Sequence, residues 1–344
     1  MNPDQGAVLL VTPNWEGSLG FFCQRALTQL GFEVRVFDYR QEALGDRYRA
    51  HPSKGPLRLV RNRLGVALMN RRLLRTVEEY APGLILVIKG ELIEPYTVKA
   101  LADKSSSVVV LWYPDASGYL IKRSYRRIAE GMAYYDISFL CDPEHVPSHV
   151  RPRIRHQEFL TFACDPEFHR PLKVSTAEKE RYASKICFVG NPHGTHSLRD
   201  QTLMALHDYP LAIWGKSWEQ TPLGKRYPSL LRGPAYGQEM LKVYSSSQIA
   251  LNLSFARYII FRNFEVPACG ALLMTEDLRA LRDFYRLDEE VVAFRNTDDL
   301  RAKLDYYLEH PDEIELIAQK GQQRTYAEHT FVHRMKTLVH KAFG

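Results

Sequence analysis

The sequence lacks any long apolar run, and it has few cysteines. No uninterrupted apolar stretch approaches the roughly 18 residues that a membrane-spanning helix needs. The polar start Met-Asn-Pro-Asp-Gln-Gly does not resemble a signal peptide. The five cysteines are odd in number, scattered and without zinc-ligand spacing, which argues against a disulfide framework. We therefore expect reduced thiols and a cytoplasmic protein.

Common catalytic signatures are also absent. The chain has no Gly-x-x-x-x-Gly-Lys-Ser/Thr phosphate loop, no Gly-x-Ser-x-Gly elbow and no His-Glu-x-x-His helix. It has no Asp-x-Asp pair to hold a divalent metal on a nucleoside diphosphate. If the ligand is such a diphosphate, protein cations and helix N-termini must neutralise its charge. We expect no metal and no cofactor.

What is present is the composition of an ordinary globular protein. The 344 residues are 45% hydrophobic and 25% charged, and the length favours two domains. The formal net charge is +6, but it is unevenly distributed. Between Arg47 and Arg75 there are nine Lys or Arg and no Asp or Glu.

This basic stretch, residues 47–75, also carries leucines at near-helical intervals: Leu57, Leu64, Leu68, Leu73 and Leu74. The pattern predicts that part of it is an amphipathic basic helix. One interpretation is a surface for a membrane, giving a peripheral location at the inner membrane surface, or for an anionic acceptor. Nucleic acid is not expected as a partner. The alternative is a solvated helix face beside a loop.

The first half of the chain alternates apolar strands with helical patterns. A strand over 6–12 is followed by a loop and a helix up to Leu30, and a second strand covers 31–37. Further strands are predicted at 84–88, 108–112 and 137–140. Fully apolar strands separated by helices indicate a parallel sheet covered on both faces. We expect a doubly wound, Rossmann-like α/β domain.

The second half repeats this pattern after a proline-rich, polar stretch. Strands are predicted at 185–190, 211–214, 247–253, 271–274 and 291–294, and the chain is helical beyond Asn296. The predicted organisation is a first domain over 1–165, a linker over 166–182, a second Rossmann-like domain over 183–325 and a terminal helix over 326–344. Two such domains would face a cleft at the carboxyl ends of both sheets.

Residues 262–276 concentrate the strongest candidates. A short helix is predicted over 262–269 between two strands, with Gly270 closing it. Arg262 and Asn263 stand at the start of this helix and Glu265 lies one turn in. A carboxylate beside a cation suits a ligand that has both a diol and a phosphate. The alternative is a surface ion pair between Arg262 and Glu265.

Two loops that follow strands of the second half are candidates for phosphate binding. Gly190 and Asn191 open the loop that leads to Arg199, and two glycines in this loop allow backbone N–H groups to approach an anion. His193 and His196 lie in the same loop, but no third metal ligand is near. The second loop contains Gly215 and Lys216, where the lysine could reach a phosphate or could be an ordinary surface residue.

Acceptor candidates follow strands of the first half. Asp115 comes after an apolar strand, where a carboxylate could bind or deprotonate an acceptor hydroxyl. The alternative is a turn, since Pro-Asp followed by Gly is a good turn sequence. Two more loops are candidates for acceptor contact. They contain Asn14, Trp15, Glu16 and Gly17, and Lys89 with Gly90 and Glu91.

These pieces, in this order, resemble the CgeB-like (spore maturation protein) branch of the group 1 glycosyltransferases, which have the two-domain GT-B fold. The segments that carry the resemblance are Trp112-Tyr-Pro-Asp115, residues 159–171, Phe188-Val-Gly-Asn191 with Arg199, Ile213-Trp-Gly215 with Trp218, Arg262 to Gly270 with Leu273-Met-Thr-Glu276, and His329-Thr-Phe-Val-His-Arg334.

The resemblance implies a glycosyltransferase of the hexosyltransferase type that uses a nucleotide-sugar donor without a metal. It implies that the second domain binds the donor and that Glu265 accepts hydrogen bonds from the ribose. Many relatives carry another glutamate eight residues earlier, where this chain has Arg257. Arg257 or Arg262 would then serve the diphosphate instead.

The same resemblance outlines a mechanism. Arg199, Lys216 and Arg262 would meet the growing charge of the departing nucleoside diphosphate. An acceptor hydroxyl, from a saccharide, protein, lipid or small molecule, would attack with retention at the anomeric carbon, and Asp115 would bind the acceptor. The terminal helix would cross back onto the first domain. The alternatives are an epimerase acting on the nucleotide sugar and a catalytically silent nucleotide- or glycan-binding module.

Overall fold

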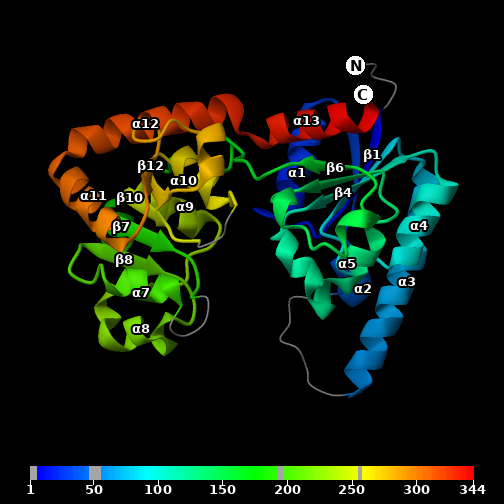
Figure 1. Ribbon diagram of the computed structural model, residues 1–344, viewed down its shortest axis with the longest axis horizontal. Coiled ribbons are helices and arrows are strands. Elements are labelled where there is room, and N and C mark those ends of the chain that lie inside the picture. The colour runs from blue at the N-terminus through cyan, green and yellow to red at the C-terminus, as the bar shows by residue number, and fades with distance from the viewer. Residues whose placement is uncertain (1–5, 46–55, 193–196, 255–257) are drawn as a thin grey trace. The chain divides into compact units, whose positions relative to one another are not determined.

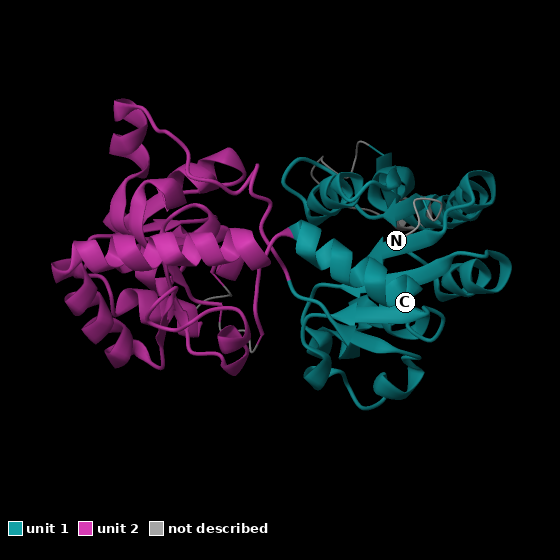
Figure 2. Cartoon of the chain, turned by 90° about the horizontal axis from the view of Figure 1, so that it is seen from above, with its two compact units in different colours: residues 1–161, 331–344 teal, residues 162–330 magenta. Residues whose placement is uncertain are grey.

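The computed structural model describes residues 6–45, 56–192, 197–254 and 258–344, and side chains of 56–61 lie outside this description. The chain forms two compact units, each an α/β fold (Figures 1 and 2). Unit 1 comprises residues 1–161 and 331–344, and unit 2 comprises residues 162–330.

Unit 1 is built on a six-stranded parallel sheet in the order β2-β1-β3-β4-β5-β6. Its central strands are the apolar runs of the sequence, and they are buried on both faces. The strands are β1 (Ala7–Val11), β2 (Glu33–Phe37), β3 (Leu84–Ile88), β4 (Val108–Tyr113), β5 (Ile137–Leu140) and β6 (Gln157–Phe159).

Helices cover both faces of this sheet. Alternate strand residues, such as Leu9 and Val11, join one core cluster with residues of α3 and α4. Trp112 packs on the other face with Phe22 of α1 and Phe331 of α13. The rings of Phe22 and Phe331 stack with centroids 5.1 Å apart. The helices are α1 (Leu19–Gln29), α2 (Tyr39–Leu44), α3 (Pro56–Tyr80), α4 (Pro95–Lys104), α5 (Arg126–Gly131) and α13 (Phe331–Phe343).

Unit 2 repeats the architecture with the strand order β12-β11-β10-β7-β8-β9, again all parallel. Two separate apolar clusters lie on the two faces of the sheet. The strands are β7 (Ser184–Val189), β8 (Leu211–Trp214), β9 (Leu231–Gly233), β10 (Ser247–Asn252), β11 (Leu272–Glu276) and β12 (Val292–Phe294).

The helices of unit 2 divide between these faces. Residues of α9 and α10 join one cluster, and residues of α7, α8, α11 and α12 join the other. The bounds are α6 (Thr176–Tyr182), α7 (Leu198–Met204), α8 (Pro222–Arg226), α9 (Gln238–Ser245), α10 (Arg262–Ala268), α11 (Thr297–Glu309) and α12 (Pro311–Glu328). The prediction of two doubly wound domains is confirmed.

The terminal helices also agree with expectation. The chain passes from α12 of unit 2 to α13, which belongs to unit 1 (Figure 2). One side of α13 is buried through Phe331, Met335, Leu338 and Val339, which recur at helical spacing. The predicted return of the C-terminus onto the first domain is therefore confirmed.

The stretch predicted as a linker differs from expectation. Residues 162–182 belong to unit 2, and His169 and Tyr182 are buried there. Two short strands, β6 and β9, were not predicted. Both lie at the edges of their sheets and are only partly buried. Strands of this kind carry no continuous apolar run, so the pattern that found the others missed them.

Candidate functional site

The candidate donor site lies at the carboxyl edge of the unit 2 sheet. In this sheet β7 and β10 are neighbours, and the strand order runs outward from them in opposite directions. This is a topological switch point, where ligands bind in open α/β sheets. The loop after β7 contains Gly190 and Asn191, and the loop after β10 begins at Leu253.

Gly190 and Gly215 lie where two loops approach each other closely at this edge of the sheet. Gly215 has a φ of +154°, and a Cβ there would overlap the carbonyl oxygen of Gly190. The same oxygen accepts a hydrogen bond of 2.7 Å from Nε1 of Trp218. A Cβ on Gly190 would lie 3.0 Å from Nη1 of Arg262. Close packing therefore requires glycine at position 215 and leaves little room for a side chain at position 190, and it brings the loops after β7 and β8 together.

Arg199 links the two loops of the switch point. Its Nε donates to the carbonyl of Leu253 and its Nη1 to the carbonyl of Asn191, each at 2.6 Å. The residue is 2% exposed, and its buried Nη2 has no hydrogen-bond partner among the residues that the structure describes. Burial, and after it the nearby charge of Arg262, lower the pKa of Arg199 to about 9, against the opposing effect of Glu276. An anion beside Nη2 would relieve this cost.

Arg262, the first residue of α10, is the second cation at this edge. Its Nη1 donates to the carbonyl of Val189 at 2.9 Å, and its guanidinium lies 5.5 Å from the ring centroid of Phe188. Arg199 stands over the same ring at 5.4 Å. Two guanidinium groups therefore share one aromatic ring at the end of β7, and their mutual repulsion favours a bound anion.

Glu265 is buried in α10. It is 7% exposed, and its Oε1 lies 3.6 Å from Nε2 of His169. The predicted alternative, a surface ion pair with Arg262, does not fit a buried glutamate, and Arg262 donates to the backbone at Val189 instead. Gly270, with a φ of +82°, follows the helix as expected.

His169 is the residue that the sequence analysis missed. It is 1% exposed, and its Nδ1 accepts a hydrogen bond of 2.9 Å from the backbone N–H of Asp165. A neutral ring held in this way carries its proton on Nε2, which faces Glu265. The segment around it lies within residues 159–171, which carry the family resemblance, but His169 itself was assigned to the linker, and no spacing in the sequence relates it to Glu265.

Other predicted donor residues occupy different positions. Asn263 is fully buried, and its Oδ1 accepts from the backbone N–H of Ile260 at 2.9 Å. Lys216 is exposed, and its backbone N–H donates to Oδ1 of exposed Asn191 at 2.8 Å. Lys216 and Asn191 thus belong to one surface loop pair, whereas Asn263 braces the chain before α10. Arg257, His193 and His196 lie outside the described residues.

The corresponding edge of unit 1 carries the predicted acceptor residues. In this sheet the switch point lies between β1 and β3. The loop after β1 is fixed by Ser18, whose Oγ accepts from Trp15 N–H and caps α1. Trp15 is 46% exposed, Glu16 is exposed, and Gly17 has a φ of +83°. Asn14 is more enclosed, since its Nδ2 donates to Gln24 at 2.9 Å.

Lys89 and Asp115 meet at this edge, from the ends of neighbouring strands β3 and β4. Nζ of Lys89 lies 2.7 Å from Oδ2 of Asp115, and both side chains are more than a quarter exposed. Lys89 has a φ of +64°, which is uncommon for a residue with a Cβ. Its ammonium also lies 5.6 Å from the ring centroid of Tyr125. The structure therefore brings two of the predicted acceptor residues together.

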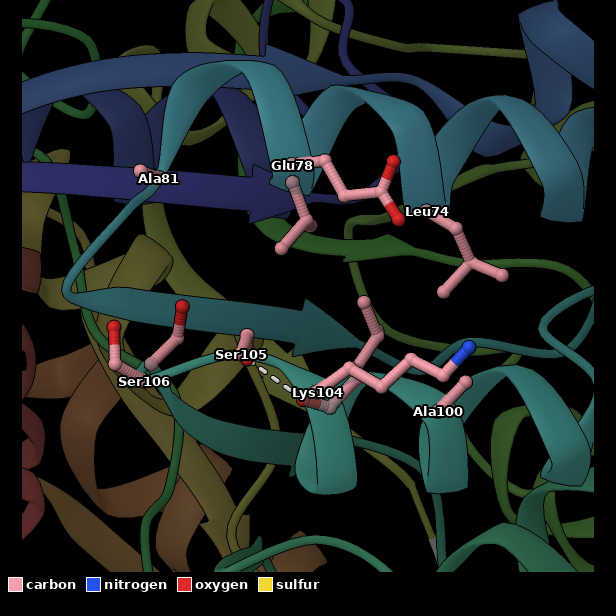
Figure 3. A pocket seen from close by; sticks show the side chains of 10 residues that line it. Leu74, Glu78, Ala81, Ala100, Lys104, Ser105 and Ser106 are labelled. Carbon is pink, nitrogen blue, oxygen red and sulfur yellow. Dashed lines mark hydrogen bonds between the residues drawn. The ribbon is translucent and has the colours of Figure 1, made fainter.

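A pocket of about 200 Å³ occurs at the opposite edge of the unit 1 sheet. Side chains of α3 and α4 line it from two sides, with Leu74 and Glu78 facing Ala100 and Lys104 (Figure 3). Ala81 and Ser107, which also line it, stand just before β3 and β4. This pocket therefore lies at the amino ends of the strands, away from the candidate acceptor residues.

The described ranges contain neither clustered metal ligands nor a membrane-spanning helix. In those ranges no group of three or more His, Cys, Asp or Glu could hold a metal ion. No helix among the described residues is both long and apolar enough to cross a bilayer. All five cysteines are buried.

Comparison with known proteins shows what parts of the chain are similar to. Residues 198–340 match the family described as "Glycosyl transferase-like". Among curated proteins none matches the sequence significantly. Several solved structures match nearly the whole chain, though with low sequence identity.

One of these structures is a sucrose-phosphate synthase from Thermosynechococcus elongatus, with a TM-score of 0.70, 13% identity and coverage of 98% of this chain and 99% of that one. A glycosyltransferase from Rickettsia africae has a TM-score of 0.67 with 11% identity, covering 98% and 97%. Anabaena HepE in complex with UDP and glucose has a TM-score of 0.63 with 10% identity, covering 98% and 99%. The chain has the GT-B fold.

Proposed function

We propose that the protein is a glycosyltransferase that moves a sugar from a nucleoside-diphosphate donor to an acceptor hydroxyl. The observation that carries this proposal is the buried Arg199 at the switch point of unit 2, beside a second guanidinium, that of Arg262. Nη2 of Arg199 has no hydrogen-bond partner in the part of the chain that the structure describes. The match of residues 198–340 to a glycosyl transferase-like family supports the proposal. So does the fold shared with Anabaena HepE, which has been solved with UDP and with UDP-glucose.

In this proposal unit 2 binds the donor. Arg199 and Arg262 neutralise the diphosphate, with the backbone at Gly190, Asn191 and Gly215 close to it and exposed Lys216 reaching it from the neighbouring loop. Glu265 accepts hydrogen bonds from the ribose hydroxyls. Arg262 and Lys216 then stabilise the charge that develops on the leaving group, so no metal or cofactor is required.

Unit 1 binds the acceptor in the same proposal. Asp115, oriented by Lys89, accepts a hydrogen bond from the acceptor hydroxyl, and the exposed Trp15 and Glu16 lie on a second loop of the same sheet edge. The reaction retains the configuration of the anomeric carbon, and the group transferred is a hexose. We place the protein in the CgeB-like branch of these enzymes and in the cytoplasm.

Calorimetry with UDP, dTDP, GDP, ADP and CDP tests the donor site, followed by assays of diphosphate release from the matching nucleotide sugars. We expect one diphosphate to bind and Glu265→Ala to weaken it by roughly tenfold or more. Glu315→Ala, at an exposed position of α12, is the matched control and should bind like the wild type. If none of the five binds, the donor site is wrong.

The products of that assay separate the alternatives. Release of a new free or nucleotide-linked sugar without any acceptor would identify an epimerase-like enzyme. Binding without turnover of any donor would identify a silent nucleotide-binding module. This alternative is tested because the sequence has Arg257 where many relatives have a glutamate.

We also propose that α3 contacts a membrane surface. Leu64 and Leu68 are 59% and 43% exposed, and exposed Arg71 and Arg75 follow at helical spacing on the same face. Leu73, which the sequence analysis grouped with them, is buried in the core instead. An exposed apolar pair flanked by arginines fits an anionic lipid surface. Residues 47–55 of the basic stretch lie outside the described residues.

A further inference from the structure

The segment over 162–171 lies along α10 as a strap. Near the start of the helix, the ring of Phe162 stacks on Phe261 with centroids 5.5 Å apart. Near the end of the helix, the hydroxyl of Tyr326 lies 3.1 Å from the carbonyl oxygen of His169 and 2.7 Å from that of Ala268. The strap is therefore held to both ends of the helix that carries Glu265.

The backbone of the strap is fixed by Asp165. Its Oδ1 accepts hydrogen bonds from the N–H groups of Glu167 at 3.0 Å and Phe168 at 3.3 Å. Its carbonyl accepts from the N–H of His169 at 2.6 Å. An aspartate followed by proline favours this kind of tight turn, because the proline presets φ at the next position. The turn therefore fixes the backbone position of His169, from which its side chain extends.

The ring of His169 is also fixed. Phe168 and Phe261 contact it edge-on, with centroids 5.1 Å and 5.4 Å away. Nδ1 accepts the N–H of Asp165 at 2.9 Å, so that Nε2 is the atom turned toward Glu265. Only 1% of the residue is exposed, so water does not compete with the ring for its contact with Glu265. Its Nε2–H is thus presented to the carboxylate from a rigid support.

We infer that His169 is a positioning residue that orients the carboxylate of Glu265 toward the ribose of the donor. The 3.6 Å between Nε2 and Oε1 exceeds a hydrogen-bond length, so the interaction in this structure is electrostatic rather than a formed hydrogen bond. It biases the carboxylate toward one orientation before the nucleotide arrives, which reduces the cost of ordering it on binding. This inference rests on the proposed function, because it assigns Glu265 to the ribose.

Two variants separate the contact with Glu265 from the support of the strap. In His169→Gln the amide nitrogen can take the place of Nε2, whereas in His169→Asn the amide oxygen can take the place of Nδ1. The probe is whichever of the five diphosphates binds most tightly, together with its 2′,3′-dideoxy analogue. The measured quantity is the ratio of the two Kd values, and thermal unfolding reports the stability of each variant.

We expect His169→Asn to weaken binding of the diphosphate by roughly tenfold and to leave the dideoxy analogue unchanged. His169→Gln should retain most of the wild-type ratio. In the Glu265→Ala background, His169→Asn should change the ratio no further, because the two residues act as one unit.

Equal losses for the diphosphate and its analogue in both variants would overturn the inference, since they would mark His169 as only a structural residue. So would an unchanged ratio in His169→Asn while Glu265→Ala still weakens binding. If the wild-type protein binds none of the five diphosphates, the proposed function itself fails and this inference fails with it.

Discussion

The ammonium group of Lys89 lies 2.7 Å from Oδ2 of Asp115, at the carboxyl ends of two neighbouring strands of unit 1. Lys89 adopts a left-handed backbone conformation at the end of its strand, with a φ of +64°. Non-glycine residues in this conformation cost energy and are concentrated at functional sites. This geometry supports the proposal that the pair contacts the acceptor.

Replacing Asp115 with asparagine tests this assignment. We expect turnover to fall by about tenfold or more, because the hydroxyl loses its charged acceptor. Binding of the nucleoside diphosphate should not change, because that site lies in unit 2. The measurements are diphosphate release from the nucleotide sugar and calorimetric Kd.

Asp103→Asn is the matched control for this experiment, since Asp103 pairs with Lys99 on the surface of α4. Both substitutions should change the free energy of unfolding by less than about 1 kcal/mol, because both pairs are partly exposed. Turnover that Asp115→Asn leaves intact, or a Kd that it alters as much as turnover, would remove Asp115 from the acceptor site.

Replacing Gly215 tests whether the close contact between the loops of Gly190 and Gly215 supports the donor site. In Gly215→Ala the new Cβ would overlap the carbonyl oxygen of Gly190 and lie 2.7 Å from Nε1 of Trp218. We expect a loss of about 3 kcal/mol or more in the free energy of unfolding, together with weaker nucleotide binding. Thermal unfolding and calorimetry would measure both.

Gly233→Ala is the control, because Gly233 also has a positive φ, +83°, but a Cβ there would meet nothing within 4 Å. Its cost should be about 1 kcal/mol, from backbone conformation alone. Similar losses in the two variants would show that the contact between the Gly190 and Gly215 loops is not what requires glycine at position 215.

A pH dependence is expected from the pair of Arg301 and Asp208. The guanidinium donates two hydrogen bonds to the carboxylate, at 2.8 Å and 2.7 Å, and this lowers the pKa of Asp208 to about 2. Because the folded-state pKa is below that of the unfolded chain, the stabilisation is present above about pH 4 and is lost as the pH falls toward 2. The effect is small, since both side chains are more than a third exposed.

Chemical unfolding of the wild type and of Asp208→Asn at a series of pH values measures this effect. The difference in their free energies of unfolding should be constant near neutral pH and should shrink steadily below about pH 4. A difference that does not depend on pH would show that the carboxylate charge is not the stabilising feature.

Sedimentation with vesicles of phosphatidylcholine and phosphatidylglycerol tests the proposed membrane surface of α3. We expect binding to weaken with added salt and to fall several-fold when Arg71 and Arg75 are both changed to glutamate. Leu68→Asp should weaken it as well. In the control variant, Lys225 and Arg232, which are exposed in unit 2, are both changed to glutamate. This variant changes the net charge equally and should bind like the wild type. Equal loss in both double variants would indicate an effect of net charge only.

The sequence by itself determined the two doubly wound domains. The runs at 84–88 and 108–112 are apolar at every position, and such runs become central strands of a parallel sheet because both of their faces are covered. Since loops follow strands in chain order, the sequence also indicated that Gly190, Lys89 and Asp115 stand at carboxyl edges. These features depend on neighbours in the chain, so a linear pattern contains them.

Tertiary structure alone decided which of those residues meet. The sequence places Arg199 after the loop that begins at Gly190, but it does not show that Arg199 is buried and donates to the carbonyls of Leu253 and Asn191. His169 lies in a stretch that the sequence presents as a linker, yet it faces Glu265. Contacts of this kind join segments far apart in the chain, and they are fixed by packing and by the requirement that buried polar groups find partners, which no local spacing encodes.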